Sequence, residues 1–420
     1  MTTRTNISGA PPTWATRLTA VAAVCLLCWG AWWTARAGAS RLHSRYGVMT
    51  RSAERVELAA SLAPSDPEAH FARGWVSTLA GDLETAAPAY ERAIRLRPRD
   101  HVLWLELGKI REQMGDTEGG LQALREAVRL APYYAEPRWQ LGNALLRAGR
   151  GVEAFVELKR ATESNPELYP NFVQQVWHAG GRDPQLLRRE ARPQSAEQTL
   201  AVVRLLVREG ATPEGLKVLR ESAVTVPAEA RQQLVAELLT AEQFAAAYEV
   251  WSAEGRAKEP IAGGGFEDGT GAEEGSFGWR FARDLQNVRL SLDADSPREG
   301  GRSLKVEYAG NSEPSAPAIS QLIPVEPGAR YRLRFSARTR ELVTGGPPYV
   351  EVIGAGKSGG ALAATAPFPS STPGWQDVAL EFAAPVAGAV RVVLRRRPCA
   401  SVPCPAFGNV WLDAFGLDKL

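Results

Sequence analysis

Three kinds of hydrophobic pattern follow one another along the chain and predict three kinds of structure. Residues 18–35 form an apolar run without a charged side chain. From about residue 61 to 255, apolar positions recur at the three-to-four-residue spacing of helices buried on one face. From residue 266 onward, apolar and polar positions alternate, which is typical of half-buried β-strands. The sequence therefore predicts a multidomain protein with an all-α region and an all-β region.

The apolar run at residues 18–35 is long enough to cross a membrane. At about 1.5 Å per residue it reaches about 27 Å, close to the thickness of a hydrocarbon core. Tryptophan, which favours membrane interfaces, flanks the run at Trp14, Trp29, Trp32 and Trp33. The alternative is a cleavable signal peptide, because residues 37–39 are small. We expect an uncleaved transmembrane helix between a tail (1–17) and a juxtamembrane helix or linker (36–60).

Two signals conflict on the orientation of this helix. Arginines are more numerous after it than before it, which would keep the bulk of the chain in the cytoplasm. Cys399 and Cys404 lie in a proline-rich segment and can close a small disulfide loop, which persists only in an oxidising compartment. Two unpaired buried thiols are the alternative. We favour an extracytoplasmic location and leave the orientation open.

A regular period runs through the helical region. One residue type recurs at a constant step in four series: Gly74, Gly108 and Gly142; Gly81, Gly115 and Gly149; Ala93, Ala127 and Ala161; Pro98, Pro132 and Pro166. Small residues let two helices approach closely, the second glycine permits a positive φ in the turn, and the proline ends the second helix. The pattern predicts three helical hairpins over residues 61–166, followed by degenerate hairpins over residues 167–255 that extend the solenoid.

These hairpins resemble tetratricopeptide repeats, with W/x-x-x-L-G near the start, A-x-x-x-Y in the second helix and A-x-x-x-x-P at the end. Arg73 and Gly120 depart from the usual leucine and alanine. Repeats of this family bind peptides or partner proteins along a groove formed by the first helix of each pair. The resemblance implies a groove lined by Phe71, Trp75, Leu105, Lys109, Trp139, Asn143 and Arg147. The alternative is that its aromatic residues pack against neighbouring helices.

A Gly-rich segment at residues 256–265 predicts a linker, and the short alternating segments after it predict an all-β sandwich over residues 266–420. The sandwich resembles the jelly-roll carbohydrate-binding modules of bacterial xylanases and glucanases. The resemblance rests on GGFEDG at the start, Q-x-x-x-V-x-P-G-x-x-Y-x-L-x-F from Gln321, W-x-x-V-x-x-x-F from Trp375 and VWLDAFGL at the end.

This second resemblance implies two sites. Aromatic residues exposed for stacking on a sugar would be Tyr308, Tyr349 and Trp411, whereas alternation places Trp279, Phe335 and Trp375 in the core. Glu267 and Asp413 match positions that hold a structural calcium in that family; an Asp413 that only accepts backbone hydrogen bonds is the alternative. The arginines at 395–397 suit either an acidic glycan or phosphate, or a solvated strand end.

Composition and motifs favour binding over catalysis. A net charge of +2 argues against a nucleic-acid-binding surface, and the four histidines show no metal-ligand spacing. The sequence singles out no catalytic residue, so we expect a protein that is not an enzyme.

The combined expectation is an inner-membrane-anchored scaffold that holds protein partners through its repeats and contacts glycan through its sandwich, in envelope polysaccharide assembly or export. The alternatives are an adaptor with a purely structural sandwich and, more weakly, a glycoside-active enzyme. Such an enzyme would need two facing carboxylates that the sequence does not single out.

Overall fold

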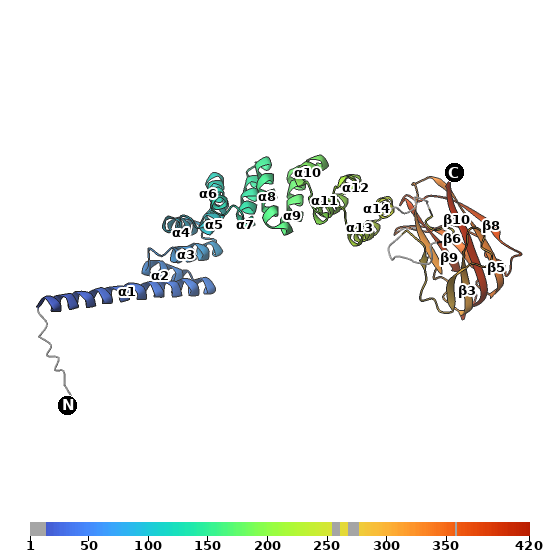
Figure 1. Cartoon of the computed structure of the whole chain (residues 1–420), viewed down its shortest axis with the longest axis horizontal. Coiled ribbons are helices and arrows are strands. Elements are labelled where there is room, and N and C mark those ends of the chain that lie inside the picture. The colour runs from blue at the N-terminus through green and yellow to red at the C-terminus, as the bar shows by residue number, and fades with distance from the viewer. Residues whose placement is uncertain (1–13, 254–260, 268–276, 358) are drawn as a thin grey trace, which may run out of the picture. The chain divides into compact units, whose positions relative to one another are not determined.

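A computed structural model describes residues 14–253, 261–267, 277–357 and 359–420 (Figure 1). The chain divides into two compact units, Met1–Arg192 and Pro193–Leu420. Residues 1–13 of the predicted tail and residues 256–260 of the predicted linker lie outside the described residues.

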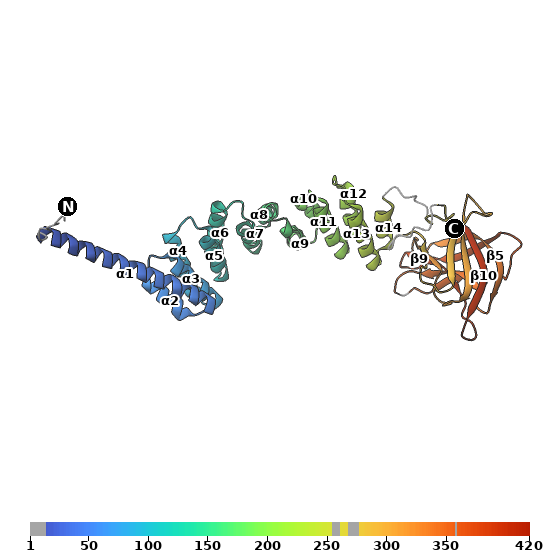
Figure 2. The same cartoon turned by 60° about the horizontal axis from the view of Figure 1, so that its bottom comes forward.

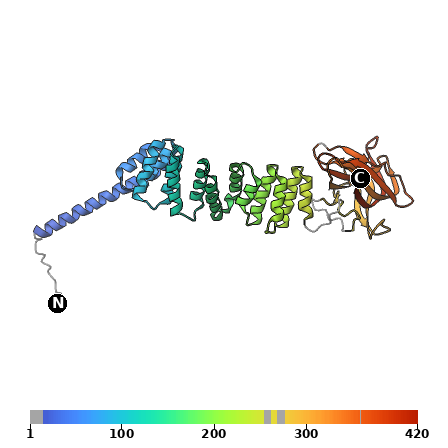
Figure 3. The ribbon, with the colours of Figure 1, turned by 90° about the horizontal axis from the view of Figure 1, so that it is seen from above.

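The first unit is a succession of helical hairpins. Its helices are α1 (Trp14–Thr50), α2 (Ala53–Leu62), α3 (Pro67–Leu79), α4 (Leu83–Leu96), α5 (His101–Gln113), α6 (Thr117–Leu130), α7 (Ala135–Arg147), α8 (Gly151–Ser164), α9 (Tyr169–Ala179) and α10 (Pro184–Ala191), with a 3₁₀ turn at Pro166–Leu168. Each odd-numbered helix packs on the even-numbered helix that follows it. Figure 3 shows these pairs from above, in blue to green.

A close backbone approach joins the two helices of each predicted repeat. A Cβ atom added at Gly142 would lie 2.5 Å from Cγ of Leu158 in the second helix, and Gly74 and Gly108 meet Tyr90 and Leu124 in the same way. The turn glycines Gly81, Gly115 and Gly149 have φ values of +76°, +84° and +74°. Both roles predicted for glycine are confirmed: close packing in the first helix and a left-handed turn after it.

The array of hairpins begins one repeat earlier than the sequence pattern indicated. Three residues in and after α1 and α2, Gly47, Ala59 and Pro64, stand one repeat step before Gly81, Ala93 and Pro98 of the periodic series. A Cβ at Gly47 would lie 2.7 Å from Val56, and Ser40, at the position of Gly74, donates a hydrogen bond from its hydroxyl to the Ala59 carbonyl (2.8 Å). Residues 36–60 were expected to form a juxtamembrane helix or linker outside the repeats. The structure makes these residues helical as part of α1 and α2, and it adds that the two helices pack as a hairpin against α3.

The N-terminal part of α1 carries its apolar side chains on the outside. Leu18, Leu27, Trp29 and Trp32 are exposed, and Figure 2 shows this end of the helix projecting away from the repeats of its unit. This long helix is apolar enough to cross a membrane by length and composition. It also continues without interruption into the buried Ser40 and the first hairpin.

A side-chain hydrogen bond joins each repeat to the one before it. His70, Trp104 and Arg138 occupy equivalent positions in three successive repeats. Each donates to the carbonyl oxygen of the proline that closes the preceding repeat, Pro64, Pro98 or Pro132, at 2.9, 2.9 and 2.8 Å respectively. Three chemically different donors therefore satisfy the equivalent proline carbonyl in three successive repeats.

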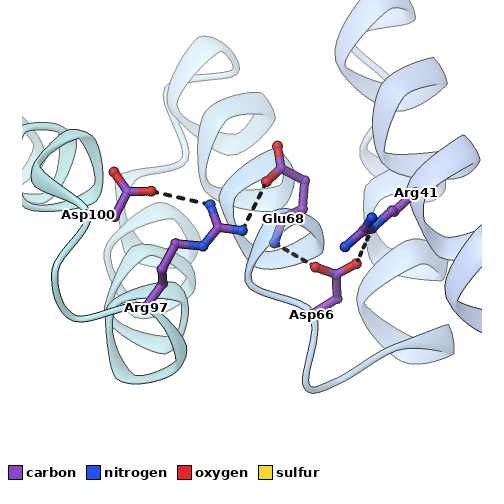
Figure 4. A network of polar contacts seen from close by, with 5 residues as sticks. All are labelled: Arg41, Asp66, Glu68, Arg97 and Asp100. Atoms are coloured by element: carbon purple, nitrogen blue, oxygen red, sulfur yellow. Dashed lines mark hydrogen bonds and ion pairs between the residues drawn. The ribbon is translucent and has the colours of Figure 1, made fainter.

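Ion pairs at the N-terminal ends of α3 and α5 link these two helices to each other and to α1 (Figure 4). Asp66 and Asp100 cap α3 and α5. Arg41 of α1 pairs with Asp66 at 3.2 Å, and Arg97 bridges Glu68 and Asp100 at 3.5 and 3.3 Å. Because the arginines are exposed, each pair contributes only about 0–1 kcal/mol. The Arg41–Asp66 pair joins α1 to α3, and the two pairs of Arg97 join α3 to α5.

In the described part of the second unit there are four helices and two five-stranded antiparallel sheets. The helices are α11 (Ala196–Arg208), α12 (Thr212–Glu221), α13 (Ala228–Thr240) and α14 (Phe244–Ser252). Sheet A has the order β1 (Arg280–Phe281), β4 (Ile319–Pro324), β9 (Ala389–Arg396), β6 (Pro348–Gly354), β7 (Ala361–Ala364). Sheet B has the order β2 (Val288–Asp293), β3 (Ser303–Asn311), β10 (Pro405–Lys419), β5 (Arg330–Thr344), β8 (Gln376–Ala383).

The two sheets enclose a single apolar core. Alternate residues of facing strands fill it, including Leu304, Phe335, Val352, Val392 and Leu412. The prediction of an all-β sandwich after an all-α region is confirmed.

Replacing Gly142 by alanine should destabilise the repeats by about 1–3 kcal/mol, because the new methyl group would overlap Leu158 in a packed interior. The measurement is urea denaturation followed by circular dichroism at 222 nm. The matched control is Gly151→Ala in the same repeat, where the nearest atom lies 4.0 Å away. Equal destabilisation by both variants would show that close packing is not what Gly142 provides.

Candidate functional site

The seven predicted groove residues occupy equivalent faces of α3, α5 and α7. Trp75, Lys109 and Asn143 hold the same position in successive repeats, and Phe71, Leu105 and Trp139 hold the position one helical turn before them. Leu105 is buried, whereas the three aromatic residues are half-buried. The repeat geometry therefore brings these residues to one side of successive first helices, with Arg147 one turn beyond.

The cations of this groove are neutralised by carboxylates that the sequence pattern did not single out. Lys109 Nζ donates to both carboxylate oxygens of Glu106 at 2.9 and 3.1 Å. Arg147 pairs with Glu112 at 2.7 Å. Glu106 lies one turn before Lys109 on α5, so helical spacing was the sequence signal for that pair. Glu112 and Arg147 lie on different helices, α5 and α7, and no local spacing indicated their contact. The groove consequently offers aromatic and neutral polar groups more than free positive charge.

The aromatic residues of the groove have a structural role as well. Phe71 stacks on Trp75 with ring centroids 6.3 Å apart and meets Tyr90 edge-on at 6.1 Å. Phe71 thereby packs against the core of its own repeat. Part of its surface serves packing, as the alternative interpretation proposed, and the remainder faces outward.

The three aromatic residues proposed for sugar stacking lie in three different places. Tyr308 is 4% exposed and belongs to the core between the sheets, so its expected exposure is wrong. Alternation along β3 explains the error, because Tyr308 has the parity of the core residues Leu304 and Val306. Tyr349 and Trp411 lie on the outer faces of sheets A and B respectively. They do not form one platform.

Tyr349 is held on sheet A by its cross-strand neighbour. Arg395 lies opposite it in the register of β6 and β9 and donates to the tyrosine hydroxyl at 3.0 Å. The guanidinium groups of Arg395 and Arg397 lie 5.9 and 5.6 Å from the ring centroid. Arg395 also forms an ion pair with the buried Glu351.

Arg396 faces the opposite way from its two neighbours and is buried. Its guanidinium donates to the carbonyl oxygens of Gly346 (3.0 Å), Ser312 (3.3 Å) and Cys404 (2.7 Å). Burial lowers the pKa of this guanidinium from its ordinary value. The interpretation of residues 395–397 as one anion-binding cluster is therefore wrong, because alternation along β9 divides the three side chains between two faces.

The structure joins Cys399 and Cys404 in a disulfide. The segment that it closes follows β9 directly, and Arg396 binds the carbonyl at its far end. Cys25 and Cys28 are free thiols on the exposed part of α1.

Trp411 lies on the outer face of sheet B among cations. Its register partners are Lys305 on β3 and Arg338 on β5. The charged groups of Arg338, Arg340 and Lys305 lie 4.5, 5.3 and 5.6 Å from its ring centroid. The side chains cover the ring, which is 3% exposed, so Trp411 is not the open stacking surface that was expected.

Trp375 extends this cluster at the edge of the sheet. It was expected in the core, but it is only half-buried, and its indole donates to the Ser296 carbonyl at 3.0 Å. Arg338 lies 5.1 Å from its ring centroid as well as over Trp411. We call Lys305, Arg338, Arg340, Trp375 and Trp411 the cationic face. Alternation of arginine along residues 330–340 was the sequence signal for it.

The carboxylate of Asp293 lies at this face and contacts Trp411. Burial disfavours its charged form, but a hydrogen bond from the Trp411 indole (2.6 Å), a backbone bond from Asp295 and the charges of Lys305 and Arg338 outweigh burial and lower its pKa. Asp293 is therefore ionised and engaged with Trp411.

The predicted calcium ligands hold one loop between β2 and β3. Asp413 is fully buried and accepts backbone N–H bonds from Arg298 and Glu299 at 2.8 and 3.2 Å. Glu267 accepts from Gly301 and Arg302 at 2.9 and 3.2 Å. Among the described residues no group of three or more acidic, histidine or cysteine side chains is placed to hold a metal. The two carboxylates would supply only part of the six to eight oxygens that calcium takes.

Replacing Arg396 by methionine should lower the free energy of unfolding of the sandwich by about 3 kcal/mol, because three buried carbonyls would lose their donor. The neighbouring Arg397→Met, at an exposed position, should change it by less than about 0.5 kcal/mol. Differential scanning calorimetry of the two variants makes the comparison. A similar loss in both would assign the effect to charge instead of to the buried hydrogen bonds.

Comparison with known proteins agrees with the repeat register. A tetratricopeptide repeat family model matches residues 67–100 and 102–134. No match to a curated protein was found.

Three of the similar solved structures illustrate how far structural likeness extends. YrrB, described as a TPR protein with an unusual peptide-binding site, is 19% identical, with 43% of this chain and 90% of that chain covered and a TM-score of 0.33. PilF of Pseudomonas aeruginosa is 17% identical, with 52% and 99% covered and a TM-score of 0.34. A structure described as "CBM4 structure and function" is 13% identical, with 38% and 99% covered and a TM-score of 0.28. These scores are too low to carry an argument, whereas the family match supports tetratricopeptide repeats at residues 67–100 and 102–134, and the close packing of the glycines agrees with it.

Proposed function

We propose that this protein is a membrane-anchored scaffold without catalytic activity. Tetratricopeptide repeats imply a scaffold for protein–protein interaction. The observation that carries the proposal is the continuity of α1, whose exposed apolar part runs directly into the first hairpin of the array. A helix that crosses a membrane in this way would hold the groove at a defined distance from the membrane surface.

The groove suits a peptide with apolar and neutral polar side chains. Lys109 and Arg147 already have carboxylate partners, so an acidic peptide would have to displace them. Half-buried Phe71, Trp75 and Trp139 supply the kind of aromatic surface that dominates binding energy at protein interfaces.

An extracytoplasmic location in an inner membrane is part of the proposal. The Cys399–Cys404 disulfide supports it, since such bonds persist in oxidising compartments. The arginines after the apolar run oppose it, but two of them have structural partners: Arg36 donates to the Leu62 carbonyl and Arg41 pairs with Asp66. Contacts within the fold thus account for the presence of Arg36 and Arg41 after the apolar run.

We assign the sandwich to the jelly-roll type, because eight of its strands form the sheets β3-β10-β5-β8 and β4-β9-β6-β7. We propose that it contacts envelope glycan, in polysaccharide assembly or export. The rival proposal is an adaptor with a structural sandwich, and the covered rings of Tyr308 and Trp411 favour it over stacking on a neutral sugar.

A structural calcium between Glu267 and Asp413 is a separate proposal. It is supported by the shared loop 298–302, and by the pKa of Asp413, which burial and then the charge of Glu267 raise above its usual value. A bound calcium ion would offset both the burial of the charged Asp413 carboxylate and its repulsion by Glu267.

Adding calcium chloride should therefore raise the melting temperature of the chain stripped with a chelator, by binding the folded state alone. Asp413→Asn should abolish the rise, whereas Asp293→Asn, on the cationic face, should keep it. An unchanged melting temperature in the unaltered protein would eliminate the calcium proposal.

A photo-reactive amino acid at Trp139, in the groove, should form adducts with a small set of proteins when the full chain is irradiated in cells. The same amino acid at Val152, exposed on the second helix of that repeat, should not. The Phe71→Ala, Trp75→Ala double variant should lose at least about tenfold of the Trp139 adduct, since a loss of about 1.4 kcal/mol weakens binding tenfold.

Proteinase digestion of the same cells before and after removal of the outer envelope tests the location. Degradation only after its removal supports the extracytoplasmic assignment, and protection in both contradicts it.

In the crosslinking experiment, adducts that form equally at Val152, or that survive the double variant, would refute the groove as the binding surface.

A further inference from the structure

The cations of the cationic face differ from the other outward arginines of sheet B in their ion pairing. Other outward arginines have carboxylate partners: Arg332 pairs with Glu381 at 2.7 Å, and Arg334 pairs with Asp418. Lys305, Arg338 and Arg340 have no ion pair with a carboxylate among the described residues. Lys305 and Arg338 lie near Asp293, which is already bonded to Trp411, and the outward Glu307 on β3 pairs with Arg289.

Arg338 occupies the centre of this face with unused hydrogen-bonding capacity. Its guanidinium lies between the rings of Trp375 and Trp411, at 5.1 and 4.5 Å from their centroids. Its Nη2 atom donates to the Asp295 carbonyl at 3.5 Å, whereas its buried Nε atom has no hydrogen-bond partner among the described residues. The two rings hold the planar guanidinium in place, which reduces the entropy lost when it binds an anion.

We infer that the cationic face binds carboxylate groups of an acidic polysaccharide. The inference rests on the proposed glycan contact and names its class: a uronate-containing chain and not a neutral one. Guanidinium groups bind carboxylates with charge-assisted hydrogen bonds, and three cations spread over β3 and β5 suit repeated charges along an extended polymer. The covered Trp411 orients the cations and does not stack on the sugar.

The chemistry of the face distinguishes this ligand from a nucleic acid. Single strands are held by bases stacked on open aromatic rings, whereas Trp411 is 3% exposed. The net charge of the chain is only +2, so it supplies no extended positive field for a phosphate backbone.

The test measures binding of the full chain, in detergent micelles, to polygalacturonate and to its fully methyl-esterified form, which has the same backbone without charge. Polygalacturonate should bind, more weakly as salt rises, and the esterified form should bind at least about tenfold more weakly, equivalent to about 1.4 kcal/mol. Lys305→Gln with Arg340→Gln should reduce polygalacturonate binding about tenfold or more. The matched control, Arg332→Gln with Arg334→Gln, removes two paired charges from the same sheet and should reduce it less than about threefold. Melting temperatures verify that both variants fold.

Each other outcome has a defined meaning. Equal binding of both polymers overturns the inference and leaves glycan contact standing. Binding of neither removes both, while the adduct test of the repeats stays independent. Equal losses in the two double variants show an effect of net charge, and oligothymidylate binding as tightly as polygalacturonate shows a general polyanion surface; either result overturns the inference.

Discussion

The approach of two helix backbones at a single glycine underlies the three hairpins from α3 to α8. At Gly74, Gly108 and Gly142 the space of a missing Cβ is taken by a large side chain of the second helix. That contact determines how closely each pair packs, and its return at every repeat step makes successive pairs alike. The groove follows from it, because identical packing places residues such as Trp75, Lys109 and Asn143 at the same position on each first helix.

The first hairpin links this array to the exposed apolar helix. Ser40 replaces the close-packing glycine and bonds the opposite helix through its hydroxyl, and Gly47 takes over close packing against Val56. Since α1 runs through both regions without interruption, the repeats follow the apolar segment with no flexible joint. Arg41 and Asp66 add a polar contact that favours one alignment of α1.

Arginine serves opposite purposes on the two sheets of the sandwich. Arg396 points inward and satisfies carbonyls beside the Cys399–Cys404 loop. Arg338 and Arg340 point outward and cover Trp411. The same residue type is thus a structural donor in one place and a source of free charge in the other, and only its partners distinguish the two.

The sequence by itself determined the features that recur at a regular spacing. Glycines at a constant step predicted the close packing and the left-handed turns, and alternation predicted the sandwich, because backbone geometry imposes both periods. The first hairpin escaped notice since Ser40 and Val56 do not match the motif by residue type, although Gly47 and Pro64 keep its step. Tertiary structure alone decided which aromatic rings are covered, which cations have partners and which arginine of residues 395–397 is buried. Those properties depend on neighbours distant in the chain, such as Trp411 with Arg338 and Arg396 with Ser312, and no local pattern encodes them.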